Sequence, residues 1–142
     1  LKTMKLIKTL ALSLILSTVV ITATASNKLT TITKAVTTPD KTICIKNPSA
    51  ADADKFFSTI TTLNFEIYKP GSVEFVNSVV ETLRKNPTIA SVTIGKVTGD
   101  YHAITIVLKS ANSKEFFVGN FKRAGLFNIK INNNDAVSLD KI

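Results

Sequence analysis

Two neighbouring segments near the middle of the chain alternate apolar with small or polar residues, and a short turn joins them. The first segment covers 89–97, the second covers 101–109, and Thr98-Gly99-Asp100 lies between them. In the second segment, Ile or Leu recurs at every other position from 104 to 108. Side chains of a strand point alternately to its two faces. The pattern therefore predicts an antiparallel hairpin with one face on the core and the other exposed.

Residues that interrupt regular structure, such as proline, glycine and asparagine, divide the chain on both sides of this hairpin into helices and strands. From residue 64 they predict a strand, a helix, the hairpin, a second helix and a last strand, at 65–68, 72–86, 89–109, 112–125 and 127–131. The order β-α-β-β-α-β predicts an α+β fold, a ferredoxin-like sandwich in which an antiparallel sheet has its helices on one face. An extra strand-helix unit at 42–63 precedes it, and we expect this unit to add an edge strand or to extend the helical layer.

The start of the chain is typical of a secretory signal. Lysines at positions 2, 5 and 8 precede an apolar run at 10–21, and Ala23-Thr24-Ala25 follows. A positive stretch, an apolar core and small residues at the cut are the parts of such a signal. We therefore expect cleavage between Ala25 and Ser26 and export to the periplasm or the medium. An uncleaved N-terminal membrane anchor is the alternative, although a spanning helix needs roughly 20 apolar residues.

The composition after the signal suits one small domain. We divide the chain into a signal peptide, a Thr/Ser-rich leader, a single α+β domain and a polar C-terminal tail, at 1–25, 26–41, 42–132 and 133–142. Residues 26–142 hold 15 basic and 10 acidic residues, a net charge of +5. This mild positive charge favours an anionic envelope polymer, a phospholipid or a protein as partner. Nucleic acid is not expected, because the charges are mixed along the chain.

The residues that most often carry chemistry are scarce. The chain has one cysteine, Cys44, and one histidine, His102, so an internal disulfide is excluded and neither a metal nor a cofactor is predicted. No catalytic motif occurs. We therefore expect a non-catalytic exported domain of a bacterial-type cell envelope that binds an envelope component or a protein. One alternative is a small extracytoplasmic enzyme or inhibitor using His102 or Cys44. The other is a self-assembling structural protein, joined through a sheet edge or an intermolecular disulfide.

The segment Lys69-Pro70-Gly71-Ser72 is the first candidate for ligand binding. A strand ends there, a glycine lets the backbone approach, and a helix N-terminus follows beside a lysine. Free backbone N–H groups at such a place suit an anion, although an ordinary connection with Ser72 as the helix cap explains the segment without a ligand. The second candidate is the exposed face of the sheet, which could bind a peptide or glycan through its small and hydroxylated residues, Thr93, Gly95, Tyr101, Thr105 and Lys109.

Cys44 lies in the short strand predicted at 42–46. Ile43 and Ile45 alternate there with Thr42, Cys44 and Lys46, so the thiol is expected on the polar face of the strand. Free cysteine is often buried, and a lone cysteine in an exported protein can also form an intermolecular disulfide. Both roles stay open for Cys44 at this point.

In outline, Val73 to Asn132 resembles BON modules, exported bacterial envelope domains of αββαβ order that often contact phospholipid. The segment Leu83-Arg84-Lys85-Asn86-Pro87, followed by the hairpin, fits that outline, while Leu108-Lys109-Ser110 stands where the family usually has a glycine. From residue 64 the order also resembles SPOR peptidoglycan-binding domains, without their typical aromatic and glycine pattern. Both resemblances imply envelope binding and concern the order of elements only.

The signal predicts a defined N-terminus for the exported protein. Mass spectrometry of protein recovered from the producing cells should give a chain that begins at Ser26, because Ala23 and Ala25 match the small-residue pattern of the cleavage site. A mature species that still carries Met4 through Ala25 would contradict the cleavage prediction.

Overall fold

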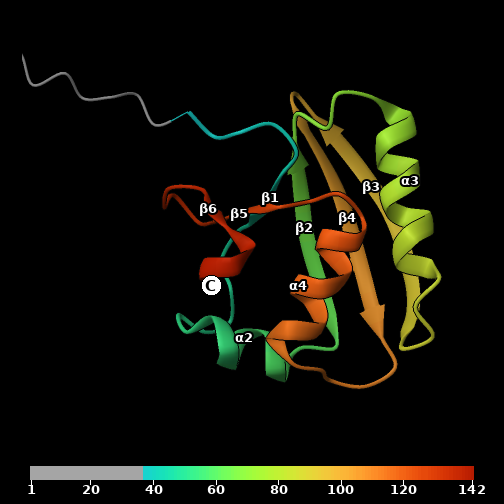
Figure 1. Cartoon of the computed structure of the whole chain (residues 1–142), viewed down its shortest axis with the longest axis vertical. Helices are drawn as coiled ribbons and strands as arrows, with labels where there is room; N and C mark the ends of the chain where they lie inside the picture. The colour runs from blue at the N-terminus through green and yellow to red at the C-terminus, as the bar shows by residue number, and fades with distance from the viewer. Residues whose placement is uncertain (1–36) are drawn as a thin grey trace, which may run out of the picture. The chain divides into compact units, whose positions relative to one another are not determined.

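The computed structural model describes residues 37–142, so the predicted signal, its cleavage site or anchor, and the leader up to residue 36 lie outside the described residues. The described part is an α+β domain with one six-stranded mixed sheet in the order β3-β4-β2-β1-β5-β6 (Figure 1). The strands are β1 Thr42–Ile45, β2 Thr62–Tyr68, β3 Ile89–Thr98, β4 Tyr101–Leu108, β5 Asn128–Ile131 and β6 Val137–Ser138. The helices are α2 Ala53–Thr59, α3 Val73–Arg84 and α4 Lys114–Arg123, followed by the 3-10 turn η1 Leu139–Lys141. Within residues 37–142 no helix could cross a membrane.

The strand order corrects the predicted ferredoxin-like arrangement. In that fold β2 would pair directly with β5 in a fully antiparallel sheet, and β1 would lie outside this pair. Instead β1 lies between them, antiparallel to β2 and parallel to β5. The parallel pairing follows from the connections, because the crossover through α4 makes β5 run in the same direction as β4. Since β1 and β4 both run antiparallel to β2, β1 must share the direction of β5.

The side chains of β1 explain why it occupies the interior of the sheet. Ile43 and Ile45 are 0% and 2% exposed and belong to the hydrophobic core, while Thr42 and Cys44 are buried outside it. The Thr42 hydroxyl donates a hydrogen bond to the carbonyl oxygen of Pro39 at 2.7 Å. Because β1 carries no charged side chain, it can lie between two neighbouring strands at little cost. The edge position, one of the two placements that we expected for this unit, is therefore wrong.

The three helices cover one face of the sheet. A single core cluster joins their buried residues to alternate residues of the strands, among them Leu63, Phe65 and Ile67 of β2 and Ile104, Ile106 and Leu108 of β4. Four phenylalanines pack across this core: the Phe57 and Phe117 ring centroids are 4.9 Å apart, and the Phe65 and Phe121 ring centroids are 5.2 Å apart. The predicted one-sided covering of the hairpin is confirmed.

Local signals fixed most element ends. Ser72 caps α3, as the sequence allowed, and Ser113 caps α4. Gly125 takes the left-handed conformation with φ +84° after α4. Asp52 caps α2 by accepting a hydrogen bond from the Lys55 N–H.

Part of the predicted polar tail packs on the domain. Residues 137–138 form β6, which pairs antiparallel with β5, and η1 follows at once. Leu139 is only 1% exposed and joins the core, and Asp140 forms an ion pair with Lys122 of α4. A single leucine in a polar stretch forms no periodic pattern, so the sequence did not predict that this segment packs on the domain.

The interior position of β1 predicts unequal effects of two isoleucine truncations. Ile43→Ala should lower the free energy of unfolding by about 2–5 kcal/mol, because it empties a fully buried site in the sheet. Ile94→Ala, at a β3 residue that is 41% exposed, should lower it by less than about 1 kcal/mol. Urea unfolding of the two variants measures this difference, and equal losses would contradict the interior position of β1.

Candidate functional site

The face of the sheet that the helices leave uncovered is called the open face here. Strand register places Cys44 of β1, Glu66 of β2 and Ala103 of β4 side by side on this face. Thr93 and Thr105 pair on it as predicted, and the Thr105 hydroxyl donates to Asn64 Oδ1 at 2.7 Å. The small or uncharged side chains of Cys44, Ala103 and the threonines leave this face hollow beside β1.

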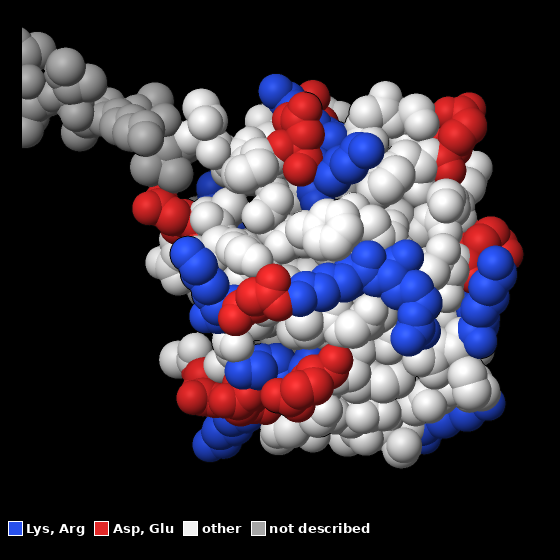
Figure 2. All heavy atoms as spheres, in the orientation of Figure 1, with Lys and Arg blue, Asp and Glu red and all other residues white. Residues whose placement is uncertain are grey.

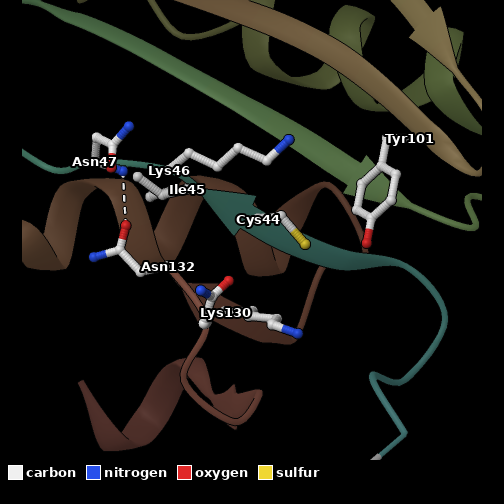
Figure 3. A pocket seen from close by; sticks show the side chains of 8 residues that line it. Cys44, Ile45, Lys46, Asn47, Tyr101, Lys130 and Asn132 are labelled. Carbon is white, nitrogen blue, oxygen red and sulfur yellow. Dashed lines mark hydrogen bonds between the residues drawn. The ribbon is translucent and has the colours of Figure 1, made fainter.

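A hollow of about 420 Å³ follows β1 on the open face, and we call it the β1 groove (Figure 3). Tyr101 lies at one end of it, Cys44 in the middle, and the loops that follow β1 and β5 at the other end. Its lining consists of a thiol, one aromatic ring, two lysines, three asparagines and one aliphatic residue: Cys44, Tyr101, Lys46, Lys130, Asn47, Asn132, Asn133 and Ile45. The predicted site residue Tyr101 is therefore part of it.

The parallel pairing of β1 and β5 brings the asparagines together. Because parallel strands end at the same edge, the loops after Ile45 and Ile131 start side by side. Asn47 and Asn132 both take left-handed backbone conformations, with φ of +50° and +55°, which asparagine tolerates better than most residues. The Asn47 N–H donates to Asn132 Oδ1 at 2.7 Å, and the Asn132 N–H donates to the Ile45 carbonyl at 2.8 Å. These hydrogen bonds join the ends of β1 and β5 into one wall of the groove.

Lys46 separates the β1 groove from a second hollow of about 220 Å³ that is lined by Glu66. The Lys46 Nζ lies 2.8 Å from Glu66 Oε2, so the two side chains form an ion pair. Glu66 Oε2 is buried and accepts no well-aligned hydrogen bond. The same ammonium group lies 5.4 Å from the centre of the Tyr101 ring. Its interaction with the Glu66 carboxylate raises the pKa of Lys46, so the lysine stays charged. The lysine side chain is 68% exposed, so solvent screens this ion pair and the pair adds little to stability.

Lys130 is the second cation of the groove. It lies opposite Cys44 in the register of the parallel pair, and its Nζ donates to Thr38 Oγ1 at 3.2 Å. It forms no ion pair with any residue of 37–142. No acidic residue within that range lines the β1 groove. The groove therefore presents positive charge to a ligand.

The thiol of Cys44 is on the polar face of β1, as predicted, and is 6% exposed. Burial raises the pKa of Cys44, the nearby Lys130 charge lowers it, and Glu66 raises it further; the net direction is upward. A protonated, buried thiol is a weak nucleophile. The intermolecular disulfide proposed for Cys44 would require this part of the strand to open.

His102 lies on the opposite face of the sheet from Cys44. It shares its strand face with the core residues Ile104 and Ile106, and β2 separates its strand from β1. A catalytic pair of Cys44 and His102 is therefore excluded by geometry, whereas an enzyme or inhibitor that uses only one of these residues remains a prediction.

The predicted site Lys69-Pro70-Gly71-Ser72 lines a hollow of about 460 Å³ together with His102. Ser72 accepts a hydrogen bond from the Phe75 N–H at 3.1 Å, as a helix cap does, and Gly71 has φ +86°. Two acidic residues, Asp40 and Asp100, line the same hollow. Their charge opposes an anion, so this place suits an anionic ligand less well than the β1 groove does. Anion binding there remains a prediction.

The charges elsewhere on the surface are mixed. On the face shown in Figure 2, acidic and basic side chains alternate over the helical side without a large patch of one sign. Within residues 37–142 no cluster of three or more His, Cys, Asp or Glu residues could hold a metal ion. Comparisons with protein-family models, with curated proteins and with solved structures find no match.

The burial of Cys44 predicts slow labelling of the native protein by a thiol reagent. At pH 7 the reaction should be at least about tenfold slower than in denaturant, because burial and the raised pKa leave little exposed thiolate. Ellman's reagent measures this directly, since the chain has one cysteine. The denatured protein serves as the control, and rapid full labelling of the native protein would contradict the burial of this thiol.

Proposed function

We propose that this protein is an exported, non-catalytic domain of a cell envelope that binds an anionic envelope component in the β1 groove. The observation that carries the proposal is the pair of lysines, Lys46 and Lys130, over a hollow that no acidic residue of 37–142 lines. Such a concave site with a few convergent polar groups is the usual form of a ligand site. The signal-like start of the chain supplies the expected location.

Two further observations favour binding over catalysis. The thiol in the groove is protonated at neutral pH because of its raised pKa, and the single histidine lies on the other face of the sheet. The groove therefore offers charge, amide groups and an aromatic ring, but no activated nucleophile with a base beside it. These groups serve recognition.

The test compares two double variants of equal charge. Protein recovered from the producing cells should sediment with an envelope fraction, and Lys46→Gln combined with Lys130→Gln should abolish most of this binding. The matched control combines Lys55→Gln with Lys85→Gln, two exposed lysines outside the groove, and should bind as the unmodified protein does. Thermal melting of both variants controls for folding.

Equal binding by all three proteins would exclude the β1 groove as the site. Absence of any binding by the unmodified protein to its own envelope would contradict the proposed function as a whole.

A further inference from the structure

The position of β1 inside the sheet restricts which ligand the groove can accept. A peptide that joins a sheet as an added strand needs a free edge with unpaired backbone groups. Below the groove, both edges of β1 already pair with neighbouring strands, β2 on one side and β5 on the other. A ligand lying over β1 must therefore be recognised by side chains rather than by strand addition, which disfavours an extended peptide.

The distribution of exposed apolar residues disfavours a membrane surface as the ligand. Domains that bind lipid bilayers insert apolar side chains beside their basic ones. The exposed large apolar residues of the described part are Val73, Ile94, Val97, Phe127 and Val137, and none of them lines the β1 groove. The two lysines of the groove stand instead beside asparagines, in a concavity that a flat headgroup layer would fill poorly.

The remaining groups of the groove suit a sugar chain. Asparagine amides both donate and accept hydrogen bonds, which matches the hydroxyl groups of a sugar. Asn132 Oδ1 already accepts a hydrogen bond from the Asn47 N–H, so the Nδ2 group of Asn132 remains as a donor at the loop end of the groove. At the other end the Tyr101 ring supplies a flat, partly exposed surface with a hydroxyl group at its tip.

The two ammonium groups add a requirement for negative charge. Lys130 forms no ion pair within the described residues, and Lys46, whose side chain is 68% exposed, forms an ion pair with Glu66. A ligand carboxylate can pair with Lys130 directly and can compete with Glu66 for Lys46. A neutral sugar would leave the charge of Lys130 without an ionic partner among the described residues.

We infer that the β1 groove binds an acidic glycan, a sugar chain that carries carboxylates, with Lys130 and Lys46 pairing the carboxylates. The asparagines at the loop end bind the sugar hydroxyls, and Tyr101 supports a sugar ring. This inference rests on the proposed function and names the chemical class of its ligand.

The experiment measures binding of the mature protein to tetragalacturonate by calorimetry in low salt. The matched probe is the same tetrasaccharide with its carboxylates methyl-esterified, and two further probes are phosphatidylglycerol vesicles and poly-L-glutamate. We expect binding of the acid form, with at least about tenfold weaker binding of the ester. Lys130→Gln should weaken binding of the acid form by a similar factor, whereas Lys55→Gln, at an exposed lysine outside the groove, should leave it unchanged. Tyr101→Ala should weaken both sugar forms, and a melting curve checks that this variant is folded.

Three results would overturn the inference. The first is equal affinity for the acid and the ester, and the second is undiminished binding by Lys130→Gln. The third is binding of the vesicles or of poly-L-glutamate in preference to the sugar. In this last case the proposed function would survive, because envelope sedimentation that depends on Lys46 and Lys130 tests the groove without assuming a sugar.

Discussion

The insertion of β1 between β2 and β5 is the constraint on which the rest of this structure depends. The four residues of β1 bury Ile43 and Ile45 in the helical core and Thr42 and Cys44 on the other face. Because this strand joins β2 to β5, it also joins the part of the sheet made by the hairpin to the part made by the C-terminal strands. Without it the sheet would lose its one parallel pair, and the loops that form the end of the groove would not meet.

The open face combines a hollow with an unbalanced charge. Its hollow arises because Cys44 and Ala103 are small where larger side chains would fill the space beside Lys46 and Tyr101. Its charge arises because Glu66 lies on the far side of Lys46, outside the groove, so that it holds one lysine without neutralising the other. A buried neutral thiol between two cations costs less than a buried carboxylate would, and it leaves the positive field intact.

The candidate site could be predicted from the sequence only in part. Tyr101 and Thr105 were expected on the exposed face because alternation in one hairpin fixes which side chains point away from the core. Lys46, Lys130 and Asn132 were missed, since they come from segments far apart in the chain and each is unremarkable in its own surroundings. A weak signal was present: Asn47 and Asn132 each follow a short apolar strand. The local candidate at Lys69-Pro70-Gly71-Ser72 was visible because its features are contiguous, but contiguity could not show that Asp40 and Asp100 flank it.

The sequence by itself determined the α+β class, most of the helix and strand ends, the hairpin and the polar-face position of Cys44. These depend on interactions between residues close in the chain, on caps, turns and side-chain periodicity. Tertiary structure alone decided the strand order, the docking of the C-terminal residues and the β1 groove. An alternating four-residue strand has the same pattern at an edge and in the interior. Its place is set by the burial of Ile43 and Cys44 against residues about 20 to 90 positions away, which no local pattern records.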